Sequence, residues 1–396
     1  MKSATFWLSQ AAIVAVPFFP HAFSQICSPE PAYSFDISTQ EELDNLSKRC
    51  TTLNESAYFY TNYTESFVLS NITHAQRYLT FYPSDIVSSL ELPDLEYVES
   101  LEINGVRGPG RVSAPRVRSI KHLYLRTYAP ETSLDFPLLE HVESLTLHGN
   151  WSSTAFDSLH TIDGGLSACQ GEYCRGSGPD QPPMSLSFPA LEHVNDSIRI
   201  GGNIAMFSTP KLATLPIDSS INIWNIGSVL NLSFPALSSA PSSVSLQGNI
   251  ASMEMPTLRD KLPALLFSTY APLSLTLLGQ QINSLTIHVP RIESLRLPNL
   301  LNFSSISISS DEPFDCGGFE NEIMQKTDGV ADDEASFHCD APSVSGGLST
   351  GAKAGIGVSV GMAGVALIGL LVYFLWRRRA KGVQKTPSGI KVSAKR

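Results

Sequence analysis

The chain has 396 residues, of which 42% are hydrophobic and 16% are charged, and its formal net charge is −10. This hydrophobic content can fill a core and excludes a disordered polymer, and the negative charge disfavours nucleic acid, so we expect no nucleic-acid partner. Nine of the 27 Lys and Arg residues lie after residue 352, where the chain has no Asp or Glu. An acidic body followed by a basic tail suggests that a membrane lies between them.

The first 24 residues have the features of a secretory signal peptide. Lys2 supplies a positive charge, residues 4–19 are apolar, and Ala22 and Ser24 are small residues just before a cleavage site at Gln25. The alternative is an uncleaved N-terminal anchor. Cleavage would leave residues 25–340 as an ectodomain in an oxidising compartment.

A short helix is expected at the start of this ectodomain. Ser38 and Glu41 have the spacing of a capping box, and Leu43, Leu46 and Cys50 follow at helical spacing. Such a helix would cover the first turn of a repetitive fold, which needs a cap at each end. The polar, acidic segment 316–339 is expected to close the other end.

An internal repeat organises the body between these ends. Each unit has a P-x-[LVI] turn, followed about seven residues later by a strand with an apolar–polar–apolar pattern. The units begin at Pro93, Pro115, Pro137, Pro189, Pro210, Pro235 and Pro256. Most of these prolines are roughly 22 residues apart, a period that is typical of solenoids. We therefore predict an all-β fold, a parallel β-solenoid with one unit per turn, and a β-sandwich is the alternative.

Residues 152–186 interrupt the repeat with Gly, Pro and Ser, and we interpret them as a surface loop. The six cysteines are all in the ectodomain and are expected to form disulfides, for which 15 connectivities exist. Proximity in the sequence suggests the pairs Cys27–Cys50, Cys169–Cys174 and Cys316–Cys339. A metal site is the alternative, but the cysteine spacing is too wide for a zinc knuckle.

Sequons for N-linked glycosylation occur only in the ectodomain. The eight asparagines are Asn45, Asn54, Asn62, Asn71, Asn150, Asn195, Asn231 and Asn302. If the chain is secreted, most of them should carry glycans and mark surfaces that are not packed.

The C-terminal part predicts a membrane anchor. Residues 341–354 are rich in Ser and Gly and are expected to form a flexible stalk. Residues 355–376 carry no charge and as a helix would span about 33 Å, enough for a bilayer core. Arg377, Arg378 and Arg379 follow, which predicts a single-pass type I topology with residues 377–396 in the cytoplasm. This basic tail could contact anionic inner-leaflet lipids, and a plain stop-transfer signal is the simpler interpretation.

Three groups of residues carry a resemblance to a known family. They are residues 38–46 before Cys50, the Phe-Pro-x-Leu segments 188–191 and 234–237, and residues 314–319 with Cys339. In order and spacing these motifs resemble the receptor L-domain-like proteins of fungal cell surfaces, over about residues 27–340. The resemblance implies a right-handed coil, heavy glycosylation and a role in cell-wall organisation at the plasma membrane. Many members carry a glycolipid anchor, whereas this chain has a predicted transmembrane helix.

Nothing in the sequence points to catalysis, and we expect no catalytic residue, metal or cofactor. Polysaccharide-active enzymes on β-coils need converging carboxylates, and only Glu102 is acidic among the outward strand positions from 102 to 307. His141 and His193 occupy the same place in the repeat, which similarity between units explains better than metal ligation.

Outward strand positions instead form a candidate binding face of polar and aromatic side chains. Its members are Tyr124, Arg126, His148, Arg199, Asn222, Trp224 and Gln247. The aromatic rings could stack on sugars or anchor a protein, and an ordinary solvated sheet face is the alternative for any one of these residues. The first hypothesis is a non-enzymatic surface glycoprotein, with its ectodomain facing the wall, that contacts wall polysaccharide or wall proteins. The alternatives are a sensor that signals through the basic tail and a polysaccharide-active enzyme.

Overall fold

The structure is a computed structural model. It describes residues 25–29, 33–61, 66–83, 88–105, 110–170, 174, 181–327 and 335–342. The predicted signal peptide, transmembrane helix and basic tail, and all but the first two residues of the predicted stalk, lie outside these residues. Among the helices that the structure does describe, none is long and apolar enough to cross a membrane.

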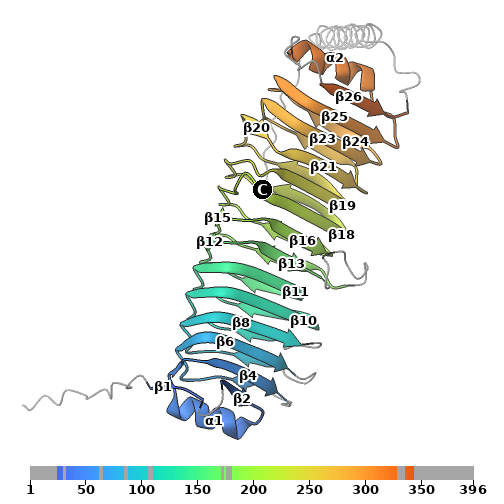
Figure 1. The fold of residues 1–396 in the computed structure, drawn as a ribbon. Coiled ribbons are helices and arrows are strands. Elements are labelled where there is room, and N and C mark those ends of the chain that lie inside the picture. Colours follow the sequence, from blue (N-terminus) through green and yellow to red (C-terminus); the bar gives the residue numbers. More distant parts are fainter. Residues whose placement is uncertain are drawn as a thin grey trace, which may run out of the picture. The chain divides into compact units, whose positions relative to one another are not determined.

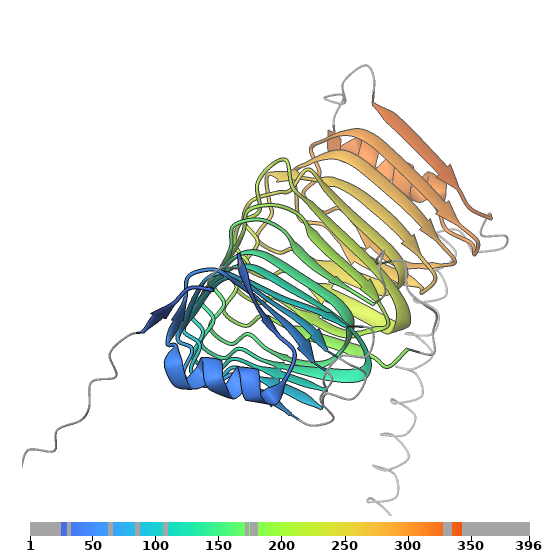
Figure 2. The same ribbon diagram turned by 60° about the horizontal axis from the view of Figure 1, so that its bottom comes forward.

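Residues 26–340 form a parallel β-solenoid, in which strands from successive turns pair side by side (Figures 1 and 2). The longest sheet, which we call the front face, contains one strand per turn. Its strands are β2 (Ser34–Ile37), β4 (Ser56–Thr61), β6 (His74–Pro83), β8 (Tyr97–Gly105), β10 (Ser119–Asp135), β11 (His141–Ala155), β13 (Leu166–Cys169), β16 (Ile198–Gly202), β18 (Ser220–Ser233), β19 (Ser243–Glu254), β21 (Ala264–Thr269), β23 (Gln281–Val289), β25 (Asn302–Ser310) and β26 (Ser336–Asp340).

Two further rows of strands complete each turn. The second face contains the distal ends of β10, β11, β18 and β19 together with β5 (Phe67–Val68), β7 (Ser89–Glu91), β9 (Arg111–Ser113), β14 (Met184–Ser187), β17 (Ile204–Ser208), β22 (Leu273–Thr276) and β24 (Ile292–Arg296). A short edge row contains β1 (Ile26–Cys27), β3 (Thr52–Leu53), β12 (Thr161–Ile162), β15 (His193–Val194) and β20 (Lys261–Leu262), with the first residues of several front strands.

The core lies between these rows and is built from ladders of equivalent side chains. Leu101, Leu145, Ile198 and Val244 belong to one ladder that continues in register through the intervening strands. Each of the four is at most 1% exposed. Because the period-two pattern of every strand buries the same position, the units close a common core only when they stack. The prediction of a stacked parallel solenoid is confirmed.

The Phe-Pro-x-Leu segments make the turn that leads out of the second face. The Leu191 amide donates to the Phe188 carbonyl at 3.3 Å, which closes a turn with proline at its second position. The phenylalanine points inward, so that Phe156 stacks on Phe188 with ring centroids 5.6 Å apart. The motif therefore supplies both the corner of the coil and a rung of its core.

The prediction that residues 152–186 form a surface loop is wrong for most of that segment. It contains the end of β11, all of β12 and β13, and most of β14. Phe156 and Leu159 occupy the places of Phe and Leu in the Phe-Pro-x-Leu segment, and both of these side chains are fully buried. Asp157 stands where the proline would be. Burial of the two apolar side chains drives this turn of the coil, and the missing proline concealed it from the sequence pattern.

The N-terminal cap is the helix α1 (Gln40–Arg49), whose buried side chains include Leu43 and Leu46. Its capping box lies one residue later than predicted: the Glu42 amide donates to Thr39 Oγ1 at 3.2 Å, and Glu42 Oε2 accepts from the Thr39 amide at 3.1 Å. The hydrogen bond from the Ser38 amide is the main cause that lowers the pKa of Glu42. The Cys27–Cys50 disulfide ties this helix to β1.

The C-terminal cap combines β26 with a second helix, α2 (Cys316–Thr327), which the sequence reasoning did not predict. Phe319 and Ile323 are buried against the last turn, and the Phe319 ring lies 5.6 Å from that of Phe314. The Cys316–Cys339 disulfide joins the start of the helix to β26. Together with Cys169–Cys174, all three disulfides join the expected pairs.

Candidate functional site

The front face carries two outward columns of side chains that run across successive strands. From β10 to β19, the first column contains Tyr124, Thr146, Ser167, Arg199, Asn222 and Ser245. The second contains Arg126, His148, Cys169, Gly201, Trp224 and Gln247. All seven residues of the predicted binding face therefore lie in these two columns. Within a column, residues on adjacent strands are about 4.8 Å apart.

Four of the seven residues come together in one cleft of about 310 Å³, which we call the front-face cleft. It is lined by Cys174, Arg199, Ile200, Asn222, Ile223, Trp224, Ser245 and Gln247. Four lining residues were predicted to be part of the binding face: Arg199, Asn222, Trp224 and Gln247. Cys174 was not, because its position beside Gly201 depends on the fold and not on the pattern of a strand.

Glycine makes the cleft possible on both sides of Trp224. A Cβ added to Gly201 would overlap the carbonyl oxygen of Cys174, so the bare backbone at Gly201 lets Cys174, which is disulfide-bonded to Cys169, form one wall. On the other side, Trp224 is in register with Gln247, and a Cβ added to Gly248 would lie 3.3 Å from Cδ1 of Trp224, so the bare backbone at Gly248 leaves room for the edge of the indole. The half-buried indole therefore lies between Gly201, whose bare backbone lets Cys174 approach, and Gln247 on the next strand.

The polar groups of the cleft are positioned along their strands. Asn222 Nδ2 donates to Ser220 Oγ at 2.8 Å, and Gln247 Nε2 lies 3.4 Å from Ser245 Oγ. Arg199 is exposed, and within the described part of the chain its guanidinium has neither an ion pair nor a hydrogen bond. The described lining contains no Asp or Glu. The described lining therefore offers amides, hydroxyls, one indole and one positive charge that has no ion pair with a described residue.

The other three predicted residues form a separate group on β10 and β11. The Tyr124 ring meets the His148 ring edge-on with centroids 5.9 Å apart, and Arg126 is in register with His148. Burial, and secondarily the charge of Arg126, lowers the pKa of His148. In the second column, Cys169 and Gly201 separate His148 from Trp224, so this group does not line the front-face cleft.

A pair of exposed tyrosines nearer the N-terminus was missed by the sequence reasoning. Tyr60 on β4 and Tyr82 on β6 are in register, and their rings stack with centroids 5.3 Å apart. Burial and the neighbouring Tyr60 raise the pKa of Tyr82. These strands precede Pro93, where the repeat was first recognised, but their period-two alternation of apolar and polar residues could have revealed the same outward positions.

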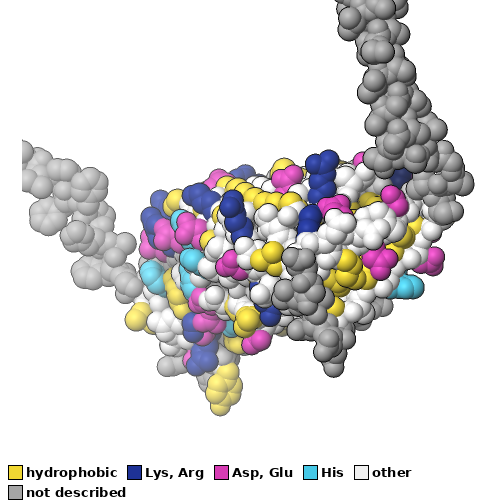
Figure 3. Space-filling view, turned by 90° about the horizontal axis from the view of Figure 1, so that it is seen from above, with side chains coloured by type: hydrophobic (Ala, Val, Ile, Leu, Met, Phe, Trp, Pro, Cys, Tyr) yellow, Lys and Arg dark blue, Asp and Glu magenta, His cyan; other side chains and the backbone are white. Residues whose placement is uncertain are grey.

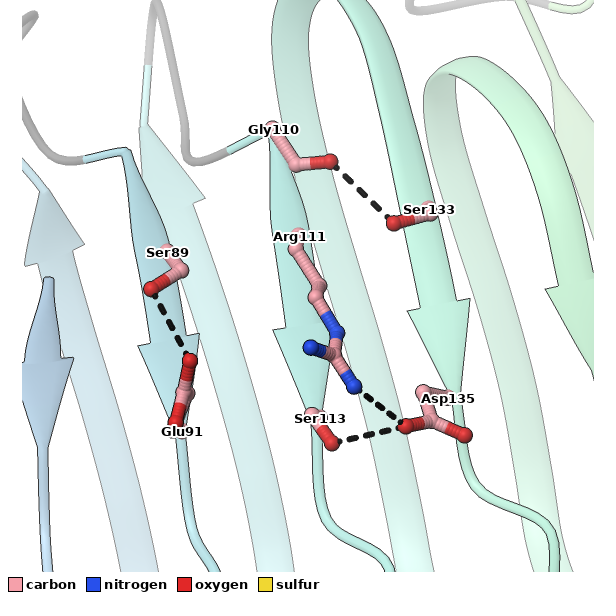
Figure 4. Close-up of polar contacts among 7 residues, drawn as sticks. All are labelled: Ser89, Glu91, Gly110, Arg111, Ser113, Ser133 and Asp135. Carbon is pink, nitrogen blue, oxygen red and sulfur yellow. Dashed lines mark hydrogen bonds and ion pairs between the residues drawn. The ribbon is translucent and has the colours of Figure 1, made fainter.

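On the second face, clustered polar side chains on β7, β9 and β10 bind one another (Figure 4). Arg111 forms an ion pair with Asp135 at 2.8 Å, and Ser113 donates to the same carboxylate at 2.9 Å. Glu91 accepts from Ser89 at 3.3 Å and lies in the same column, with Ser113 between it and Asp135. Two strand spacings place these two acidic positions about 10 Å apart. The sequence did not point to this pair, because the predicted outward positions lay on the front strands and the other acidic clusters, 311–315 and 332–334, belong to the C-terminal part of the sequence.

Two further ion pairs lie elsewhere on the solenoid. Arg118 binds Glu140 at 2.6 Å and Lys121 binds Glu99 at 2.8 Å, both near the short edge row. Figure 3 shows acidic, basic and histidine side chains intermixed rather than separated by sign. Arg199 differs from these residues, since its charge has no described partner.

The described sequon asparagines avoid the front-face columns. Asn45, Asn195 and Asn231 are exposed, and Asn231 lies on the second face, where its Oδ1 accepts from Ser252. Asn54 and Asn302 are half-buried, with side-chain oxygens that lack hydrogen-bond partners. Asn71 donates to the Ser47 carbonyl and Asn150 to Gln181, whereas Asn62 lies outside the described residues.

No group of three or more His, Cys, Asp or Glu side chains is placed to hold a metal ion in the described ranges. His141 lies 3.2 Å from Asp163, and His193 Nδ1 lies 2.6 Å from Thr214 Oγ1, so these two equivalent histidines have different partners.

Fold and site together define a capped parallel β-solenoid with a polar, aromatic cleft on one sheet. Comparison of the chain with protein-family models, curated proteins and solved structures finds no match.

Proposed function

We infer that this protein is a non-enzymatic surface glycoprotein whose front face contacts cell-wall polymers and supports fungal wall organisation. In this proposal the solenoid is a right-handed, receptor L-domain-like ectodomain that faces the wall. It is held at the plasma membrane by the helix predicted over residues 355–376. The observation that carries the proposal is the front-face cleft, in which an indole is surrounded by amide and hydroxyl groups.

This combination of groups suits a sugar better than a flat protein surface. Aromatic rings stack on the apolar face of a pyranose, while amides and hydroxyls bond its hydroxyl groups. An extended β-linked glycan advances per sugar by a distance close to one strand spacing. A polymer lying along the coil axis could thus meet equivalent positions on consecutive strands.

The expected positions of glycans also favour the front face as the surface that binds a polymer. A glycan on exposed Asn231 would cover part of the second face, whereas no described sequon lies in the two front columns from β10 to β19. The front face would then be the surface left open to a large partner.

Binding of the full-length protein, purified in mild detergent, to insoluble β-glucan, chitin and a wall mannoprotein fraction tests this proposal. Trp224→Ala should weaken binding about 30-fold, because a central aromatic anchor contributes about 2 kcal/mol or more. Tyr270→Ala is the matched control, since Tyr270 is 70% exposed and outside the cleft. Absence of binding to all three materials, or equal losses in the two variants, would reject the proposal.

A further inference from the structure

The front-face cleft has a charge that the proposed function does not explain. Arg111, Arg116 and Arg118 are each ion-paired with a carboxylate at 3.1 Å or less. Arg199 has no such partner among the described residues, although the chain as a whole carries a net charge of −10. Arg259 and Arg296 also lack a described partner, but neither lines the front-face cleft, so Arg199 is the arginine that an anion bound in the cleft would meet.

The position of Arg199 suits recognition of an anionic group attached to a ring. Arg199 and Asn222 are neighbours in the first column, and Gly201 and Trp224 are neighbours in the second. The guanidinium and the indole thus project from adjacent strands on the same face and line the same cleft. A pyranose stacked on Trp224 would place a substituent within about one strand spacing of Arg199.

We propose that the front-face cleft selects sugars that bear a carboxylate or a phosphate, with Arg199 binding the anion and Trp224 the ring. This inference rests on the proposed function and specifies its ligand. Guanidinium matches the planar geometry of carboxylates and the oxygens of phosphates with two parallel hydrogen bonds, which ammonium cannot reproduce. The described lining of the cleft contains no Asp or Glu that would compete with such an anion for Arg199.

The test compares three soluble glycans of similar length on the full-length protein: a polyuronate, a phosphorylated mannan and a neutral β-glucan. Wild-type protein should bind at least one of the anionic glycans about tenfold more tightly than the neutral one. Arg199→Gln should remove that difference, with a loss of affinity for the anionic glycan about tenfold larger than any loss for the neutral glucan. Arg199→Lys should restore only part of it, and the polyuronate and mannan arms separate carboxylate from phosphate recognition.

Arg118→Gln is the matched control, because it removes an exposed arginine that is paired with Glu140 away from the cleft. Thermal unfolding of each variant checks that the solenoid is intact. Raising the salt concentration from about 0.05 to 0.5 M should weaken anionic binding and spare neutral binding.

The outcomes separate this inference from the function on which it rests. Equal binding of all three glycans, or the same loss for all three in Arg199→Gln, would overturn anion selection and leave the proposed function standing. Absence of any glycan binding by the wild type would reject both. Equally strong competition by an acidic peptide such as poly-glutamate would show that the anion need not be on a sugar, which also overturns the inference.

Discussion

The front and second faces are built from the same repeat, but the outward polar side chains that we compare on them differ in whether they bind one another. On the second face, Arg111, Ser113 and Asp135 satisfy one another across two strands. On the front face, Arg199 and Trp224 project into a cleft without such partners among the described residues. The backbone ladder and the buried ladders stabilise both faces, so outward residues are free to differ. A solenoid can therefore keep one surface closed on itself while another remains available for a ligand.

The strongest test of this comparison removes the core that both faces share. Phe188 is fully buried and stacks on Phe156, so Phe188→Ala should lower the free energy of unfolding by about 3–5 kcal/mol. Denaturant unfolding measures this change. Ser153→Ala, at an exposed outward position of the second face, should stay within about 0.5 kcal/mol of wild type. A similar decrease in the free energy of unfolding in both variants would contradict the view that the buried side chains, and not the outward ones, stabilise the solenoid.

A smaller effect is expected when the network of the second face is broken. Arg111 and Asp135 have side chains that are 52% and 32% exposed, so Arg111→Gln should cost at most about 1 kcal/mol of stability. Affinity for wall polymers should not change, because Arg111 is far from the cleft in the coil. Loss of polymer binding in this variant would show that the second face, too, takes part in recognition.

The pH dependence of stability offers a subtler test of the front face. Because the pKa of His148 is lowered in the folded state, the unfolded chain binds a proton there at a higher pH than the folded chain does. Stability should therefore rise with pH across the window below about pH 6.5, and His148→Gln should flatten this rise. His288, exposed in the same column, provides the control variant His288→Gln. Unfolding midpoints between about pH 5 and 7 give the slopes, and equal slopes in wild type and His148→Gln would refute the effect.

The smallest effect is expected from removing a sequon on the second face. Asn231→Gln should abolish one glycan, seen by glycopeptide mass spectrometry, and leave polymer affinity within about twofold because Asn231 is not on the front face. Half-buried Asn54, whose Nδ2 donates to Ser28 at 2.7 Å, should be the less occupied sequon of the two. Full occupancy at Asn54 together with an empty Asn231 would reverse the proposed distribution of glycans.

Much of the fold was predictable because one physical rule is repeated in every turn. Alternation such as that of Leu101 and Ile103 marks the buried side of a strand, and the proline period marks the corners. The turn at Phe156 and Leu159 was missed because it lacks the proline, and helix α2 because its weak apolar pattern begins with two glycines. The capping box was misplaced by one residue because Ser38 and Thr39 are both able to cap, and only the backbone geometry at Thr39 selects between them.

The sequence predicted which residues of the candidate site point outward, but not which of them line the same cleft. Alternation alone placed all seven residues on one face, since the period of a strand decides which side chains point outward. It could not show that Arg199 and Trp224 line one cleft while Tyr124 and His148 lie apart. That grouping depends on the strand β13, which the sequence pattern did not reveal, and on Cys174, which the disulfide with Cys169 holds beside Gly201.

The amino-acid sequence by itself determined the stacking of the coil, its inward ladders and the pairing of its cysteines, because each follows from local periodicity or proximity along the chain. Only the tertiary structure decided which outward residues become neighbours, which charges find partners and where a wall of the cleft arises. These properties depend on the register between turns that are far apart in sequence, and on a bare backbone at Gly201 that lets Cys174 approach.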